Sequence, residues 1–287
     1  MIGPTTRPKP PLEQRLWGYL GAAAAAWFAI WMLFFSQSVP THFAWDVQPR
    51  YAQAFIGAGY IFRTAFFLYV ARQPDWFRLR WAVWGNLAFT GTLLLASYWH
   101  IEQFTWSQFL PPTAHIWVIL YVFEPVSMLY LIPRGILRAE PRIEAGPLHP
   151  LFRKFLVLTA GLLLMHGLLL VINPEFAATR WPWELNPLDA RIVAAWFLGW
   201  SVWSGTMAFA RDWAEIRAPA ALFVLNGAAL TAVAVIFSGE LRADVSPTSS
   251  LVWGVVALTL AMVAFVVVQE RRARRIVSTP APSEAPA

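Results

Sequence analysis

Residues 155–172, with the sequence FLVLTAGLLLMHGLLLVI, contain no Asp, Glu, Lys or Arg. At a rise of about 1.5 Å per residue, a helix of this length comes close to crossing a hydrocarbon layer of about 30 Å. Arg153 and Lys154 precede the run, so we predict a membrane span over residues 153–172 with positive charge at its start. This run decides the fold class, because a helix on the surface of a soluble protein would carry a polar face here.

Seven other apolar blocks of similar length surround this run. They cover residues 17–36, 52–71, 81–99, 112–133, 189–210, 218–238 and 249–269. The blocks are continuously apolar and show no short alternation of polar and apolar positions, which excludes a β-barrel. In a chain of 287 residues that is 58% hydrophobic and 13% charged, this pattern predicts an all-α integral membrane protein with eight transmembrane helices.

Basic residues concentrate in every second segment between the blocks. Seventeen of the 22 Lys and Arg lie in the N-terminal segment, in the second, fourth and sixth loops and in the C-terminal tail. This distribution predicts that both termini are cytoplasmic. The compact loops favour a cell membrane, with a bacterial inner membrane as the working assumption. Topology already accounts for these charges, so we do not expect nucleic-acid binding.

A short motif occurs twice and divides the chain into two parts. Residues 45–49 read WDVQP and residues 183–187 read WELNP, and each copy leads into an even-numbered block. Three further matches follow in the same order: Ala71-Arg72 with Ala210-Arg211, Arg78 with Arg217, and Asn86 with Asn226. We therefore predict two parallel four-helix repeats, residues 1–140 and 141–275, related by an axis along the membrane normal. Residues 276–287 are expected to form a disordered cytoplasmic tail.

Each copy of the motif has two interpretations. In the structural one, Gln48 or Asn186 caps a helix that begins at the following Pro, and the Trp of the motif lies at headgroup depth. In the functional one, acids near the outer face form a vestibule that attracts cations. The candidate residues of this vestibule are Asp46, Glu102, Glu184 and Asp189.

Arg63 and Glu124 lie well inside predicted spans, where charge is costly unless it is paired or hydrated. Both are about a dozen positions from the outer ends of spans that run in the same direction, so they could meet. Other polar residues near this depth are Asn86, Asn226, Ser201 and Ser204. This polar layer is either a static lock between helices or a site for a small solute or ion.

Histidines provide a further set of candidates. His100, His115 and His166 map to the outer side of the membrane, where paired His could ligate haem. No His-x-x-x-His spacing occurs, so no metal site is predicted, and the absence of Cys excludes thiolate ligands. We predict no cofactor, with haem as the alternative.

Three classes of function remain open. The leading hypothesis is a small permease or channel-like protein that has a polar site between two repeats, lies in the lipid bilayer and binds a small solute or ion. The second is a non-catalytic scaffold or assembly subunit, and the third is a haem-binding protein or membrane-embedded enzyme. The sequence contains no phosphate loop, nucleotide fingerprint or nucleophile elbow, and we assign no catalytic residue.

Overall fold

The computed structural model describes residues 9–106, 113–138, 140, 142–245 and 247–278, and this part of the chain contains helices but no strands. The long helices are α1 (Leu12–Phe34), α3 (Arg50–Arg72), α5 (Ala82–Trp99), α6 (Thr113–Arg138), α7 (Pro150–Ile172), α9 (Pro187–Ala208), α10 (Trp213–Ile236) and α11 (Pro247–Ser278). The short helices are α2 (Val39–His42), α4 (Trp76–Leu79) and α8 (Pro174–Thr179). Single 3₁₀ turns cover Ser36–Ser38, Ile101–Gln103 and Ser238–Glu240.

Six of the described helices are long and apolar enough to cross a membrane, namely α1, α3, α6, α7, α10 and α11. The chain therefore has the helices of a multi-pass membrane protein. The two other predicted spans correspond to α5 and α9, which are not among these six. In α9, sixteen of the 22 residues are buried. A helix surrounded by other helices needs fewer apolar residues, because little of its surface could face lipid.

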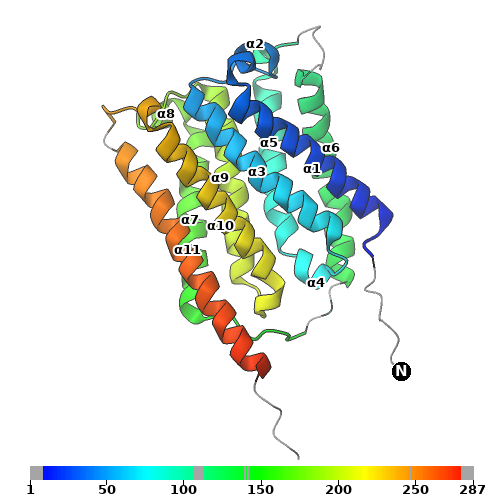
Figure 1. Cartoon of the computed structure of the whole chain (residues 1–287). Helices are drawn as coiled ribbons and strands as arrows, with labels where there is room; N and C mark the ends of the chain where they lie inside the picture. The colour runs from blue at the N-terminus through cyan, green and yellow to red at the C-terminus, as the bar shows by residue number, and fades with distance from the viewer. Residues whose placement is uncertain (1–8, 107–112, 139, 141, 246, 279–287) are drawn as a thin grey trace, which may run out of the picture.

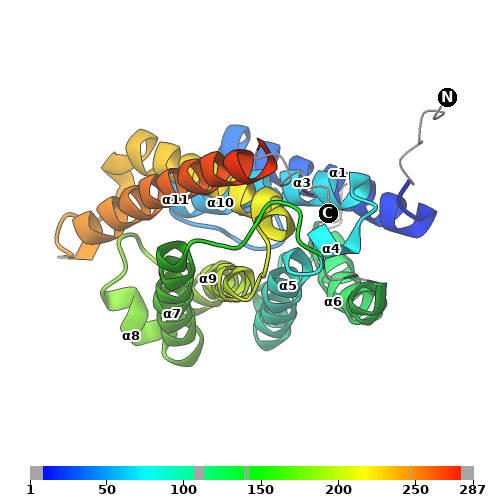
Figure 2. The ribbon, with the colours of Figure 1, turned by 90° about the horizontal axis from the view of Figure 1, so that it is seen from below.

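The helices form two rows when the bundle is seen from one end (Figure 2). One row has the order α1, α3, α10, α11, and the other has the order α6, α5, α9, α7, with neighbours in each row packed on one another. Each row therefore contains two helices from residues 1–140 and two from residues 141–278. α1 begins and α11 ends at the same end of the bundle, opposite to α2 and α8 (Figure 1).

Close contact between α5 and α9 joins the two halves at the centre of the second row. At Gly85, an added Cβ would lie 2.7 Å from the carbonyl oxygen of Gly199 and 2.5 Å from the ring of Trp203. Trp203 also donates a hydrogen bond from its indole N–H to the Ala82 carbonyl. Glycine at position 85 is thus required for the backbones to approach this closely.

Two helices continue well past the predicted ends of their apolar blocks. α11 continues through Ser278, so residues 276–278 are helical and not part of a tail; residues 279–287 lie outside the described part. α6 passes through Pro125 and Pro133 and ends at Arg138, beyond the predicted end at residue 133. In each case the helix extends past the apolar block, where charged residues can face an aqueous phase without breaking the backbone hydrogen bonds.

The two motif copies begin their helices differently. Asn186 caps α9 as predicted, because its side-chain oxygen accepts the N–H of Asp189 at 2.8 Å. The prediction for Gln48 was wrong. α3 begins at Arg50 after a cis Gln48–Pro49 bond, and no side chain caps it. The second copy alone therefore has a side-chain cap.

Candidate functional site

Arg63 and Glu124 meet inside the first half of the bundle. One terminal nitrogen of Arg63, Nη2, forms an ion pair with Glu124 Oε2, and the other, Nη1, donates to Asn86 Oδ1 at 2.6 Å. The three residues come from α3, α6 and α5. Beside them, the hydroxyls of Tyr60 and Tyr121 are hydrogen-bonded at 2.5 Å. We call these five residues the Arg63 cluster.

The Arg63 cluster is enclosed by protein. Arg63 is 2% exposed and Glu124 is 7% exposed. The guanidinium carbon of Arg63 lies 4.8 Å from the ring centroid of Phe67 and 4.6 Å from that of Phe89, so two aromatic faces partly replace its hydration. The charges of the Arg63 cluster are therefore paired and enclosed between α3, α5 and α6.

The other predicted members of the polar layer lie elsewhere. Ser201 donates to the Ala160 carbonyl at 2.8 Å and Ser204 to the Leu156 carbonyl at 3.0 Å, so both fasten α9 to α7. Asn226 makes no hydrogen bond to the Arg63 cluster, and its Oδ1 atom has no partner in the described residues. The candidates therefore divide into a buried ion-pair cluster, two helix-packing serines and one isolated amide.

Asn226 lines a cavity in the second half of the bundle. The cavity has a volume of about 830 Å³, its open side included, and lies between α3, α7, α9, α10 and α11. Its walls are aromatic and aliphatic, with Phe55, Phe197 and Leu230 among them. α11 closes it with residues that are half-buried, except for the buried Met262, while Trp253 and Leu260 on the same helix are exposed. The cavity thus reaches the side of the bundle that would face lipid.

One of the four outer acids does not face solvent. Asp46, Glu102 and Glu184 are exposed, but Asp189 is 1% exposed and accepts the indole N–H of Trp45 at 2.8 Å. The prediction was therefore wrong for Asp189, because the N-terminal turn of α9 is covered by the first copy of the motif. Trp183 of the second copy lies over Tyr51 of α3, with ring centroids 4.7 Å apart. Each motif copy thus packs on the opposite half.

The three candidate histidines do not converge. Nη1 of Arg191 lies 2.6 Å from Nε2 of His100. Burial lowers the pKa of His100, and the positive charge of Arg191 lowers it further. His115 lies against the ring of Trp106, and His166 is hydrogen-bonded to the Leu162 carbonyl on its own helix. Within the described ranges, no three His, Asp or Glu side chains gather to hold a metal ion.

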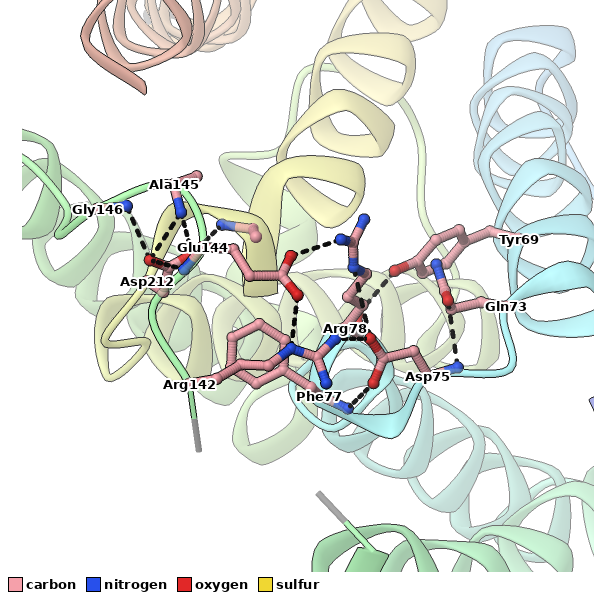
Figure 3. A network of polar contacts seen from close by, with 11 residues as sticks. Tyr69, Gln73, Asp75, Phe77, Arg78, Arg142, Glu144, Ala145, Gly146 and Asp212 are labelled. Atoms are coloured by element: carbon pink, nitrogen blue, oxygen red, sulfur yellow. Dashed lines mark hydrogen bonds and ion pairs between the residues drawn. The ribbon is translucent and has the colours of Figure 1, made fainter. Parts of the chain in front are cut away.

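A polar network joins the two halves at the end of the bundle where α1 begins (Figure 3). Arg78 and Arg142 each form ion pairs with both Asp75 and Glu144. Asp212 then accepts the backbone N–H groups of Glu144 at 3.1 Å and Gly146 at 2.8 Å, and that of Ala145 between them. The segment 142–146 is thereby fixed between α4 and α10.

This network should depend on pH through Glu144. Partial burial acts to raise the pKa of Glu144, but hydrogen bonds and charges from Arg142 and Arg78 outweigh it, so the pKa is lowered below its ordinary value of 4.5. The stabilising contribution is therefore present above pH 4.5 and is lost as the pH falls through the lower, folded-state value. The hydrogen-exchange protection factors of residues 142–146 should fall below pH 4.5, and Glu144→Gln should show the lower protection already at pH 7. Equal pH dependence in both proteins would contradict this prediction.

Some residues of these sites were not identified from the sequence. Asp212 and Glu215 form a capping box at the start of α10, which their spacing of three could have indicated. Glu215 also accepts the side-chain N–H groups of Arg80 and Trp81, both at 2.5 Å, and so links α10 to the start of α5. The aromatic residues that line the cavity could not be recognised in the sequence, because their spacing fits helix–helix packing equally well.

No protein-family model, curated protein or solved structure matches this chain.

Proposed function

We propose that this chain is a permease-type membrane protein that takes a small, mostly apolar molecule into the cavity between α3, α7, α9, α10 and α11. The observation that carries the proposal is a difference between the halves. In the first half, Phe28, Trp117 and Tyr121 fill the interior, with Trp117 and Tyr121 ring centroids 4.4 Å apart. The corresponding space in the second half is open.

The correspondence between halves supports a parallel repeat. α1, α3, α5 and α6 correspond in order to α7, α9, α10 and α11. When each helix is replaced by its counterpart in the other half, the observed contacts are reproduced. The packing of α1 on α3 then matches that of α7 on α9, and the packing of α5 on α9 matches that of α10 on α3. Asp75 and Asp212 each accept the N–H two residues later, at the starts of α4 and α10. These parallels support duplication with an axis along the membrane normal.

The same proposal includes the topology. All eight long helices cross the membrane, and the end of the bundle with α4 and the C-terminus of α11 faces the cytoplasm of the cell, since the basic residues gather there. We assign the Arg63 cluster a structural role in this scheme, because its charges are paired and enclosed. The ligand site is then the cavity around Asn226.

Filling the cavity tests this function. In protein labelled with 5-fluorotryptophan and held in detergent micelles, dodecane or dodecan-1-ol should shift the ¹⁹F resonance of Trp200, which lines the cavity. Val255→Trp adds a ring from α11 into the cavity and should abolish the shift. Val267→Trp on the same helix is the matched control, because Val267 is 41% exposed and does not line the cavity.

The proposal predicts that Val267→Trp binds the probes as the wild type does. It is wrong if neither probe shifts the Trp200 resonance in the wild type, or if Val255→Trp leaves the shift unchanged.

A further inference from the structure

Four polar atoms that belong to residues lining the cavity have no hydrogen-bond partner in the described residues. They are the indole N–H groups of Trp183 and Trp200, the Oδ1 atom of Asn226 and the hydroxyl of Thr159. All four side chains are at least nine-tenths buried. A buried polar atom without a partner costs free energy, so such atoms in a native protein are usually satisfied by something bound. Four such atoms belong to residues around this one cavity.

Thr159 and Trp200 lie near one level along the bundle, and Asn226 lies between one and two helical turns beyond them. Counting along the helix axes, Thr159 is about 14 Å from the start of α7, Trp200 about 12 Å from the end of α9, and Asn226 about 20 Å from the start of α10. These helix ends lie on the same side of the bundle. Trp183 lies closer to the other side, and the ring of Phe55 contacts both indoles, with centroids 5.4 Å from Trp183 and 6.0 Å from Trp200.

The chemistry of the wall restricts the ligand. None of the described residues that line the cavity is charged. An ionised headgroup would therefore be buried without a counter-ion, which is strongly unfavourable. Trp200 can only donate and Asn226 Oδ1 can only accept, and a hydroxyl group is the smallest group that satisfies both kinds of atom.

We infer that the cavity binds a neutral, mostly apolar molecule that carries a hydroxyl group, with this group between the level of Trp200 and Thr159 and that of Asn226. This rests on the proposed function and specifies its ligand class. The apolar part lies against Phe55, Phe197 and Leu230, and Trp183 offers one more donor toward the outer end. The exposed helix α11 forms the wall through which such a molecule can enter from lipid.

Comparison of probes that share one chain length tests the ligand class. Dodecan-1-ol, dodecane, dodecanoate and dodecylammonium are titrated at pH 7 into the fluorotryptophan-labelled protein, and binding is followed at the resonance of Trp183. Dodecan-1-ol should bind at least about fivefold more tightly than the other three, since one hydrogen bond contributes roughly 1 kcal/mol.

Two variants remove the hydrogen-bonding groups one at a time. Trp200→Phe keeps an aromatic ring but loses the N–H, and Asn226→Leu loses the acceptor. Each should weaken dodecan-1-ol roughly fivefold to tenfold and leave dodecane unchanged. Trp181→Phe is the control, because the Trp181 indole N–H is also buried without a partner but does not line the cavity.

Each remaining outcome decides against the inference. If dodecane and dodecan-1-ol bind equally, or if neither variant changes their ratio, the cavity takes apolar chains alone and water satisfies its polar atoms. Tighter binding of dodecanoate or dodecylammonium would show that the site accepts charge. If no probe binds, both the ligand class and the proposed function are wrong. If dodecane binds as tightly as dodecan-1-ol, only the ligand class is wrong.

Discussion

Replacing Glu124 with Gln should lower the free energy of unfolding by about 3 to 5 kcal/mol. The substitution keeps the shape of the side chain but leaves the guanidinium of Arg63, which is 2% exposed, without a counter-ion. Asn86 and the rings of Phe67 and Phe89 remain in contact with Arg63, but none of them carries a negative charge. Reversible unfolding in mixed micelles, followed by circular dichroism, measures the change.

Removing both charges should restore most of this stability. In the double variant Arg63→Met/Glu124→Leu no buried charge is left, and apolar side chains of similar volume can fill the space. Glu184→Gln is the control, because Glu184 is exposed and surface substitutions of this kind change stability by less than about 0.5 kcal/mol. If Glu124→Gln unfolds like the wild type but no longer binds a probe, the Arg63 cluster is a ligand site and its structural assignment is wrong.

Replacing Asp212 with Ala should cost about 2 to 3 kcal/mol and release segment 142–146. Asp212 is fully buried, and its carboxylate caps α10 through the Ala214 N–H at 2.8 Å while accepting three N–H groups from this segment. Alanine leaves all four donors without their acceptor. Limited proteolysis should therefore cut this segment faster in the variant, and thermal unfolding should begin at a lower temperature.

Asp244→Ala provides the comparison for this prediction. Asp244 forms an ion pair with Arg242 at 3.1 Å, but its side chain is 72% exposed, so little stability should be lost. Unchanged cleavage of segment 142–146 in Asp212→Ala would mean that water replaces the carboxylate and that the ion pairs of Arg142 hold the segment alone.

Local patterns predicted the helices well and some of their contacts. The apolar run at residues 155–172 lies in α7, and Asn186 caps α9 as its position before Pro187 indicated. The meeting of Arg63 and Glu124 followed from depth alone, since two charges at one level in parallel spans have few other partners. Gln48 failed as a cap because α3 begins one residue later, at Arg50, so that Pro49 takes the N-cap position.

The cavity around Asn226 could not be predicted in the same way. Its wall combines Phe55 of α3 with Thr159 of α7, Trp200 of α9 and Asn226 of α10, and no spacing in the sequence relates these positions. Asp189 shows the same difficulty, since an acid beside a predicted headgroup region was expected to face solvent but lies under Trp45.

The sequence by itself determined that this chain is helical and built for a membrane, because each apolar block must satisfy its own backbone hydrogen bonds when water is absent. That requirement is local, and composition and length are enough to state it. The tertiary structure alone decided which polar side chains meet, that the first half is filled by rings around Arg63, and that the second half is open around Asn226. These features depend on how side chains from distant helices share volume, which no single helix specifies.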